Sequence, residues 1–160
     1  MLSKKNPHRQ DMTKKPRYWN VAVKYLSSKD VVMKKLIKKY DDKILTTRGD
    51  IFFSLCKSII GQQISVAAAD SVFSKFKKVC RGKIKPNVVN NKTFSQLKKC
   101  GLSKQKVKGI KELSKKFLNK EFKPKLIKKM NDEDAIVYLS SLRQIGRWSA
   151  EMILLFTFNR

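Results

Sequence analysis

The sequence predicts an all-α fold, and three observations support this prediction. Apolar residues recur at spacings of three and four along most of residues 18–160, which places their side chains on one face of a helix. No stretch shows the sustained alternation of apolar and polar residues that a half-buried strand requires. Residues that favour helix ends, such as Asp, Ser and Gly, stand where the apolar periodicity stops.

The first 17 residues differ from the rest of the chain. They are polar and basic, contain Pro7 and Pro16, and lack apolar periodicity, so they predict a disordered basic arm. From residue 18 onward, Trp19, Val23 and Leu26 form one apolar stripe, and a second stripe follows the Ser-Ser-Lys-Asp break. We therefore expect a pair of helices at the start of a helical domain that covers residues 18–160.

The next predicted helices form the core. Asp50 is the expected N-cap of a helix over 51–60, IFFSLCKSII, which is apolar almost all round and should lie at the centre of the protein. Gly61 interrupts this segment, and a second helix is expected over 65–79. The remaining predictions are, in order, a loop over 86–92, a short helix over 93–99, a helix capped by Ser103 and a helix over 132–142.

The net charge of +26 is the strongest compositional signal. Such a field attracts polyanions, nucleic acid above all. Only seven of the 38 basic residues are arginine, and a lysine excess of this kind also arises from AT-rich coding sequence. The charge alone therefore leaves both explanations open.

Other features exclude whole classes of function. Cys56, Cys80 and Cys100 are far apart without a CxxC pair, and the single histidine, His8, lies in the arm, so we expect no metal site and no cofactor. No apolar run approaches the ~18 residues of a membrane span, and the N-terminus lacks the apolar centre of a signal peptide. We expect a monomer in a bacterial cytoplasm, associated with the nucleoid and not with a membrane.

A glycine turn joins two helices near the end of the chain. The segment LRQIGRWSA lies within a predicted helix-hairpin-helix at about 135–158. Gly146 is expected to give the turn a backbone conformation closed to larger residues, and the following helix would offer unpaired N–H groups to a phosphate. Arg143 and Arg147 would add charge, and Ser149, in the first turn of that helix, joins them and Gly146 as a candidate for DNA phosphate binding. The alternative is that the glycine turn only connects two helices.

Two further segments accompany the hairpin: IIGQQISVAAA (59–69) and LSKQKVKGIKELSKKF (102–117). Together, in this order, the three segments resemble motifs of the 3-methyladenine DNA glycosylase II family, within the helix-hairpin-helix DNA glycosylase superfamily. The resemblance covers residues 18–160. Gln144 stands where the hairpin of the family usually has its first glycine.

The resemblance implies an all-α helix-hairpin-helix DNA glycosylase fold and a role in base excision repair. Such an enzyme flips an alkylated purine such as 3-methyladenine out of damaged double-stranded DNA and hydrolyses its N-glycosidic bond. Gln63 matches the family position that wedges into the duplex, and Trp148 matches an aromatic residue of the base pocket. The alternatives are a polar helix cap for Gln62 and Gln63 and a core aromatic for Trp148.

The resemblance also indicates the chemistry. Bifunctional glycosylase-lyases have a lysine at the position of Trp148, so a monofunctional hydrolase is implied. The catalytic aspartate of the family is expected after Arg160, so no catalytic residue is assigned within this chain. The chain is then expected to be truncated, to lack the C-terminal part of the fold, to be inactive as given, and to leave its apolar residues 152–158 uncovered. Glu151 would be the first acid to reconsider.

Two other functions remain open at the level of sequence. One is a helix-hairpin-helix protein that binds DNA without cleaving it, and the other is a basic RNA-binding protein. In each DNA-binding hypothesis, Lys57 and the lysines of 104–108 join the hairpin arginines as candidate phosphate contacts.

Overall fold

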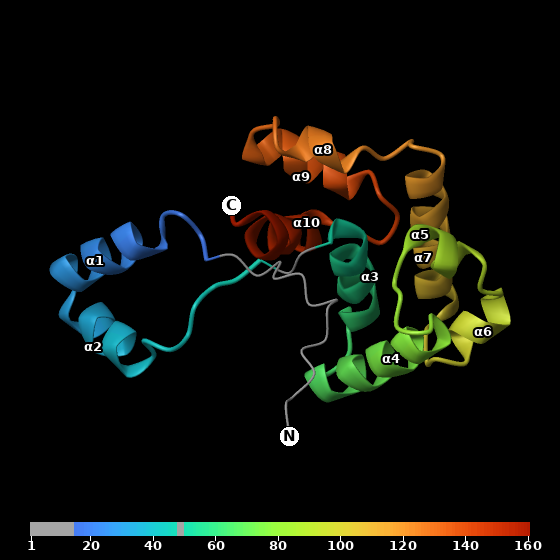
Figure 1. The fold of residues 1–160 in the computed structure, drawn as a ribbon, viewed down its shortest axis with the longest axis horizontal. Coiled ribbons are helices and arrows are strands. Elements are labelled where there is room, and N and C mark those ends of the chain that lie inside the picture. The colour runs from blue at the N-terminus through green and yellow to red at the C-terminus, as the bar shows by residue number, and fades with distance from the viewer. Residues whose placement is uncertain (1–14, 48–49) are drawn as a thin grey trace, which may run out of the picture.

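The computed structural model describes residues 15–47 and 50–160, and within these ranges it confirms the all-α prediction. The predicted basic arm lies outside the described residues except for 15–17. The described residues form ten α-helices and one π-helical segment, shown in Figure 1: α1 (Trp19–Lys29), α2 (Val31–Lys39), α3 (Ile51–Gly61), α4 (Val66–Val79), α5 (Pro86–Asn90), α6 (Phe94–Lys98), α7 (Lys104–Leu118), α8 (Pro124–Ile127), α9 (Asp132–Ser140), α10 (Arg147–Ile153) and η1 (Leu154–Phe158).

Helix α3 lies at the centre of the fold, as its composition predicts. The Asp50 side chain begins it by accepting hydrogen bonds from the backbone N–H groups of Phe52 and Phe53, at 2.8 and 3.2 Å. Because α3 is apolar on nearly every face, it contacts α4, α7 and α10 at once. Its buried apolar residues are Phe52, Leu55, Cys56, Ile59 and Ile60.

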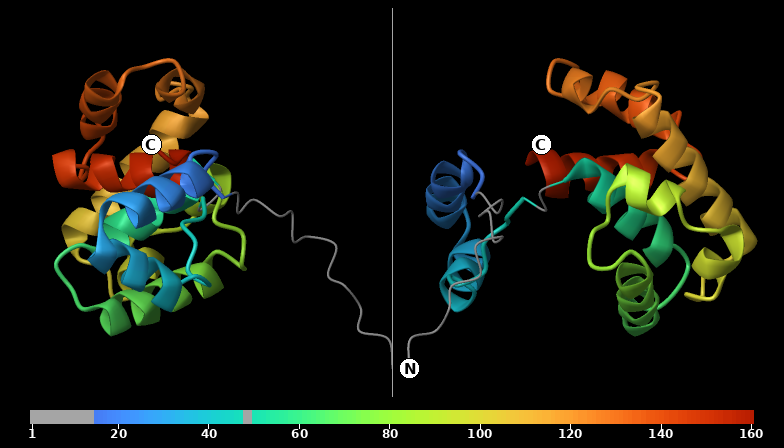
Figure 2. Two further views of the ribbon diagram at one scale, coloured as in Figure 1. Left: turned by 90° about the vertical axis from the view of Figure 1, so that its left-hand side faces the viewer. Right: turned by 45° about the vertical axis from the view of Figure 1, so that its right-hand side comes forward.

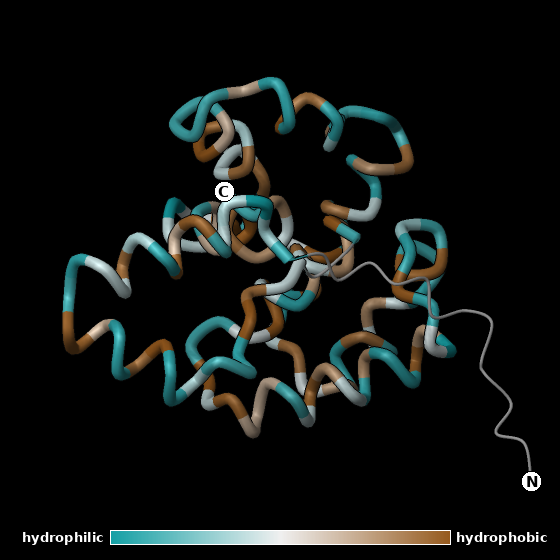
Figure 3. The backbone as a smooth tube through the Cα atoms, turned by 60° about the vertical axis from the view of Figure 1, so that its left-hand side comes forward, coloured by the Kyte–Doolittle hydropathy of each residue, from teal (hydrophilic) through white to brown (hydrophobic). Residues whose placement is uncertain are grey.

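The helices around α3 bury one face each. Helix α7 begins at the cap Ser103 and directs Val107, Ile110 and Leu113 inward. Its exposed lysines are Lys104, Lys108 and Lys115. Hydrophobic and hydrophilic residues accordingly recur in short groups along the helices (Figure 3). Helix α7 packs on α5 and α6, whereas α9, α10 and η1 pack together on another side of α3.

Helices α1 and α2 form a separate hairpin. The Asp30 side chain caps α2 by accepting from the Met33 N–H at 2.7 Å, and the two helices contact each other. Figures 1 and 2 show this pair to one side of the remaining helices. Neither helix contains a buried residue. The central core is therefore built by residues from α3 onward.

Two short helices differ from the sequence-based prediction. The predicted loop over 86–92 contains α5, and α8 was not predicted at all. Each begins with a proline, Pro86 or Pro124, at its first helical position, where the missing N–H and the fixed φ of proline favour a helix start. Val89 of α5 and Ile127 of α8 are fully buried, so packing stabilises segments too short to be helical alone.

The expectation that residues 152–158 are uncovered is wrong. Ile153 and Leu154 are each only 4% exposed, because α10 contacts α3 while η1 contacts α9. Arg160 fixes the end of this segment. Its guanidinium donates to the carbonyls of Ile127 and Met130, both at 2.9 Å, and pairs with the Asp132 carboxylate at 2.6 Å.

The described residues hold neither a helix long and apolar enough to cross a membrane nor a cluster of three or more His, Cys, Asp or Glu side chains placed to bind a metal ion. The three cysteines are buried free thiols. Burial raises the pKa of Cys56 well above its ordinary value and that of Cys80 to about 11. These thiols are therefore protonated at neutral pH and serve as small core residues.

Candidate functional site

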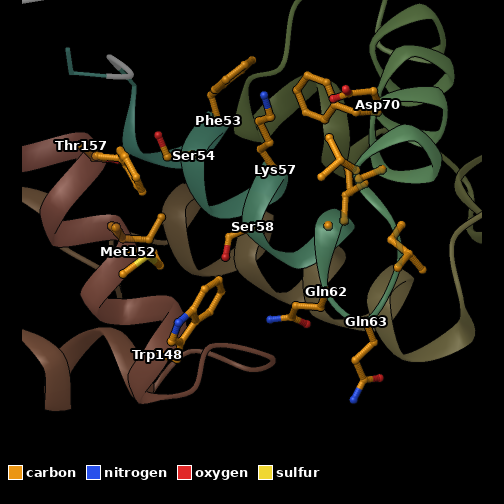
Figure 4. A pocket seen from close by; sticks show the side chains of 18 residues that line it. Phe53, Ser54, Lys57, Ser58, Gln62, Gln63, Asp70, Trp148, Met152 and Thr157 are labelled. Carbon is orange, nitrogen blue, oxygen red and sulfur yellow. The ribbon is translucent and has the colours of Figure 1, made fainter. Parts of the chain in front are cut away.

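A pocket of about 720 Å³ opens between α3, α4 and the α10–η1 segment. Figure 4 shows the side chains that line it, which are mostly apolar or aromatic. Two hydroxyls in its lining, those of the buried Ser54 and Thr157, have no hydrogen-bond partner among the described residues. This volume and this mixture of apolar walls with a few polar groups are typical of sites for small organic ligands.

Trp148 forms part of the pocket wall but does not belong to the core. It lies in the first turn of α10 and is 68% exposed, so the core alternative for this residue is wrong. Packing does not account for a large aromatic ring in this position, since tryptophan is usually well buried. Its open face is available to stack on a planar group in the pocket.

Gln63, the predicted wedge residue, lies in the turn of residues 62–65 that connects α3 to α4. This turn is called the wedge turn after that prediction. Its φ of 55° is in the left-handed region, which non-glycine residues seldom adopt. Gln63 is also among the residues that line the pocket, and Figure 4 shows its exposed side chain beyond Gln62, on the side away from Trp148. Gln62 occupies the C-cap position of α3, but its amide bonds to the hairpin segment and not to its own helix.

The hairpin turn, residues 142–146, joins α9 to α10 with a geometry that corrects one expectation. Gly146 has φ of −90°, and a Cβ added there would meet nothing within 4 Å. Its backbone is therefore open to any residue, and the predicted conformational need for glycine is wrong. The left-handed residue is Gln144, with φ of 68°, at the position where the family hairpin usually has its first glycine. Gln144 thus adopts a backbone conformation typical of glycine.

The two arginines of the hairpin already have partners. Arg147 donates two hydrogen bonds to Glu133, at 2.9 and 2.7 Å, and one to Glu151 at 3.0 Å. This pairing lowers the pKa of the Glu133 carboxyl and raises that of Arg147. Arg143 donates to the Gln105 amide oxygen at 2.9 Å. Both guanidinium groups remain at the surface, so a phosphate would have to share or replace these partners.

Ser149 lies inside the hairpin. It is 5% exposed, and its hydroxyl oxygen is 3.4 Å from the Gln62 amide nitrogen. Any phosphate contact from Ser149 would therefore come from its backbone N–H group. Such backbone groups at the start of a helix suit an anion.

The candidate lysines differ in their surroundings. Lys57 lines the pocket, with its ammonium 5.6 Å from the centroid of the Phe73 ring. Lys106 donates to the carbonyls of Ile60 and Gln62 at 2.9 and 2.7 Å, and burial lowers its pKa. Of the three lysines in 104–108, the two others, 104 and 108, are exposed and are the ones available to a phosphate.

Sequence reasoning missed the acid of the pocket. Among the residues that line it, Asp70 of α4 carries the carboxylate, whereas Glu151 forms an ion pair with Arg147. A signal was present in the sequence: Asp70 follows Val66 by four residues and precedes Phe73 by three, so all three share one helix face. Figure 4 shows Asp70 and Trp148 on opposite sides of the pocket.

Comparison with known proteins places this chain in a family. Residues 56–152 match the model described as HhH-GPD superfamily base excision DNA repair protein. The chain is 31% identical over 145 residues to alkylbase DNA glycosidase-like protein mag2 of Schizosaccharomyces pombe, covering 87% of this chain and 68% of that protein. It is 26% identical to DNA-3-methyladenine glycosylase 1 of the same yeast, covering 85% of this chain and 62% of that protein.

A solved structure supports the fold. The structure of Schizosaccharomyces pombe 3-methyladenine DNA glycosylase (Mag1) in complex with abasic DNA matches with a TM-score of 0.74 and 24% identity, covering 88% of this chain and 71% of that one. The chain thus spans about two thirds of the length of the two curated relatives.

Proposed function

Because this chain belongs to the HhH-GPD superfamily of base excision DNA repair proteins, we propose that it binds damaged duplex DNA and receives a flipped alkylated purine beside Trp148. The proposed activity is hydrolysis of the N-glycosidic bond of a base such as 3-methyladenine, in keeping with the names of its relatives. The observation that carries the proposal is the 68% exposed Trp148 ring on the wall of the pocket.

The surrounding residues supply the other parts of a base-flipping site. Extrusion of a base costs about a few kcal/mol and leaves a gap in the base stack. In our proposal, the exposed Gln63 side chain fills this gap. The hairpin turn would hold a backbone phosphate through the N–H groups at the start of α10, with Arg143 and Arg147 beside it. We propose that the protein acts as a monomer on one lesion at a time.

The direct test is release of 3-methyladenine from methylated duplex DNA. The chain is incubated with DNA that carries radiolabelled methyl groups, and the free bases are separated by chromatography. Release above the uncatalysed rate that is lost in Trp148→Ala would support the proposed activity and would overturn the expectation that residues 1–160 are inactive. Release that is unchanged in this variant would contradict a stacking role for Trp148.

One observation favours a second candidate, a protein that binds lesions without excising them. Hydrolysis through a cationic sugar requires a carboxylate close to the flipped nucleotide, and the pocket acid Asp70 is exposed and lies across the pocket from Trp148. Preferential binding of lesion-containing duplex without any base release would support this candidate over the enzyme.

Binding to duplex DNA should depend strongly on salt. The net charge of +26 and the exposed arginines indicate that phosphate contacts dominate affinity, so log affinity should fall with log salt by about 0.9 per contact. Arg143→Ala should lower this slope by about one contact. Fluorescence anisotropy at several salt concentrations measures both quantities, and a salt-independent affinity would contradict this prediction.

We also expect excision without strand cleavage. A lyase forms a Schiff base through an amine, and the position occupied by lysine in bifunctional relatives holds Trp148 here. Borohydride treatment of the protein on damaged or abasic DNA should therefore trap no covalent adduct. An adduct that disappears when a lysine near the hairpin is mutated would overturn the monofunctional assignment.

A further inference from the structure

Lys106 of α7 holds the end of α3 at the wedge turn. Its ammonium group donates to the carbonyls of Ile60 and Gln62, at 2.9 and 2.7 Å. Carbonyls at the end of a helix lack partners within that helix, and Lys106 supplies one for each of these two. Burial lowers its pKa, which agrees with an ammonium group turned inward and away from solvent.

Gln62 joins the wedge turn to the hairpin turn. Its amide nitrogen donates to the Gln144 carbonyl at 2.6 Å and lies 3.4 Å from the Ser149 hydroxyl. Figure 4 shows the Gln62 amide turned toward the Trp148 side of the pocket, whereas Gln63 points away from it. The two neighbouring glutamines therefore differ: the Gln62 amide is bonded within the protein, whereas the exposed Gln63 side chain is available to a ligand.

Each of the two turns contains a residue in a disfavoured backbone conformation. Gln63 and Gln144 have φ values of 55° and 68°, and non-glycine residues keep such values only where their surroundings fix them. Lys106 binds the carbonyl that precedes Gln63, and Gln62 binds the carbonyl of Gln144. The same two side chains therefore restrain both conformations.

Helix α7 also supports the hairpin turn directly. A Cβ at Gly109 would lie 2.8 Å from the Gln144 Cγ atom, so the absence of a side chain there leaves room for Gln144. Gly109 follows Lys106 by three residues and thus shares its side of α7. One face of α7 therefore contacts both turns.

We infer that Gln62 and Lys106 are positioning residues that hold the Gln63 side chain at a fixed place relative to the hairpin turn. Binding of a phosphate at the hairpin turn then sets where Gln63 enters the duplex. The inference rests on the proposed function, because it assigns both turns to one DNA ligand. It also gives Lys106 a role different from that of Lys104 and Lys108, the exposed lysines available to a phosphate.

The test compares three methionine variants of the full 160-residue chain. Lys106→Met and Gln62→Met keep an unbranched side chain but remove the donors, whereas Lys115→Met removes the same charge from an exposed site on α7. Affinity is measured for an intact duplex and for the same duplex with a tetrahydrofuran abasic analogue, across a range of salt. The ratio of the two affinities measures how well Gln63 fills the abasic site. The dependence of log affinity on log salt measures the number of phosphate contacts.

We expect Lys106→Met and Gln62→Met to lower the abasic-to-intact affinity ratio by about tenfold while the salt slope stays at the wild-type value. Lys115→Met should keep the wild-type ratio. If Lys106→Met does not unfold cooperatively on heating, Gln62→Met alone decides. A wild-type abasic-to-intact affinity ratio in Gln62→Met would overturn the inference. So would a Lys106→Met protein that keeps this ratio but has a salt slope lowered by about 0.9, because Lys106 would then contact a phosphate.

The experiment distinguishes failure of the proposed function from failure of the positioning role. A wild-type protein that binds both duplexes equally would contradict lesion recognition before any variant is compared, and the inference would fall with it. A wild-type preference that survives in both Gln62→Met and a folded Lys106→Met would contradict the positioning role alone.

Discussion

Trp148→Ala is expected to weaken binding of a duplex that carries one 3-deaza-3-methyladenine by about 5- to 150-fold, because stacking of a base on an aromatic ring contributes ~1–3 kcal/mol. This analogue has the shape of the proposed substrate base and a stable glycosidic bond. The ring is 68% exposed, so its removal should change the free energy of unfolding by less than about 0.5 kcal/mol. Anisotropy and thermal denaturation measure the two effects separately.

The chain provides a matched control for this variant. Trp19 of α1 is the second of the two tryptophans and does not line the pocket, so Trp19→Ala should bind the modified duplex like the wild-type protein. In a Trp19→Phe background, Trp148 is the single fluorescent tryptophan, and stacking should quench it. Two results together would exclude Trp148 from the base pocket: wild-type affinity in Trp148→Ala, and no quenching of Trp148 fluorescence in the Trp19→Phe background.

Gly109→Ala is expected to disturb the hairpin turn from the adjacent helix. The new Cβ would lie 2.8 Å from the Gln144 Cγ and 3.4 Å from its Cβ, and overpacking of this kind costs ~1–3 kcal/mol. Alanine gains ~1 kcal/mol over glycine within a helix, so the net loss of stability should be about 1 kcal/mol. Because the turn must move, affinity for duplex DNA should fall by about tenfold.

The double variant Gly109→Ala with Gln144→Gly separates this clash from other effects. It removes the side chain that the new methyl group would meet and places glycine at the left-handed position, so stability and affinity should both recover. Gly146→Ala is the contrasting variant, because its Cβ meets nothing within 4 Å and should leave the unfolding free energy within about 0.5 kcal/mol. No recovery in the double variant would show that the turn does not rest on Gly109.

Much of the fold follows from local sequence signals. Asp50 and Ser103 each cap a helix at the predicted residue, because a short polar side chain before an apolar run satisfies the free N–H groups there. The helices that begin at Pro86 and Pro124 were missed or assigned to a loop. Their stability comes from burial of one residue each by neighbouring helices, and such tertiary packing leaves no periodic pattern within so short a segment.

The candidate site shows the same contrast between features that local sequence predicts and features that depend on tertiary contacts. Trp148 on the pocket wall is consistent with the prediction from the hairpin motif, and its exposure removes the core alternative. The residue in the left-handed conformation is Gln144 and not Gly146. The Gln144 carbonyl accepts from Gln62, and a Cβ at Gly109 would lie 2.8 Å from its side chain, and both neighbours are distant in sequence. The inward orientation of Lys106 likewise depends on the end of α3, which is 46 residues away in sequence and beyond any local pattern.

The α1–α2 hairpin has a consequence for local unfolding. Its helices bury no residue, so the hairpin can open while the core stays folded. Its backbone amides should then exchange with deuterium much faster than those of α3, whose residues Leu55 and Ile59 are completely buried. Protection should therefore divide the described residues into two cooperative units, with α3 in the slower one.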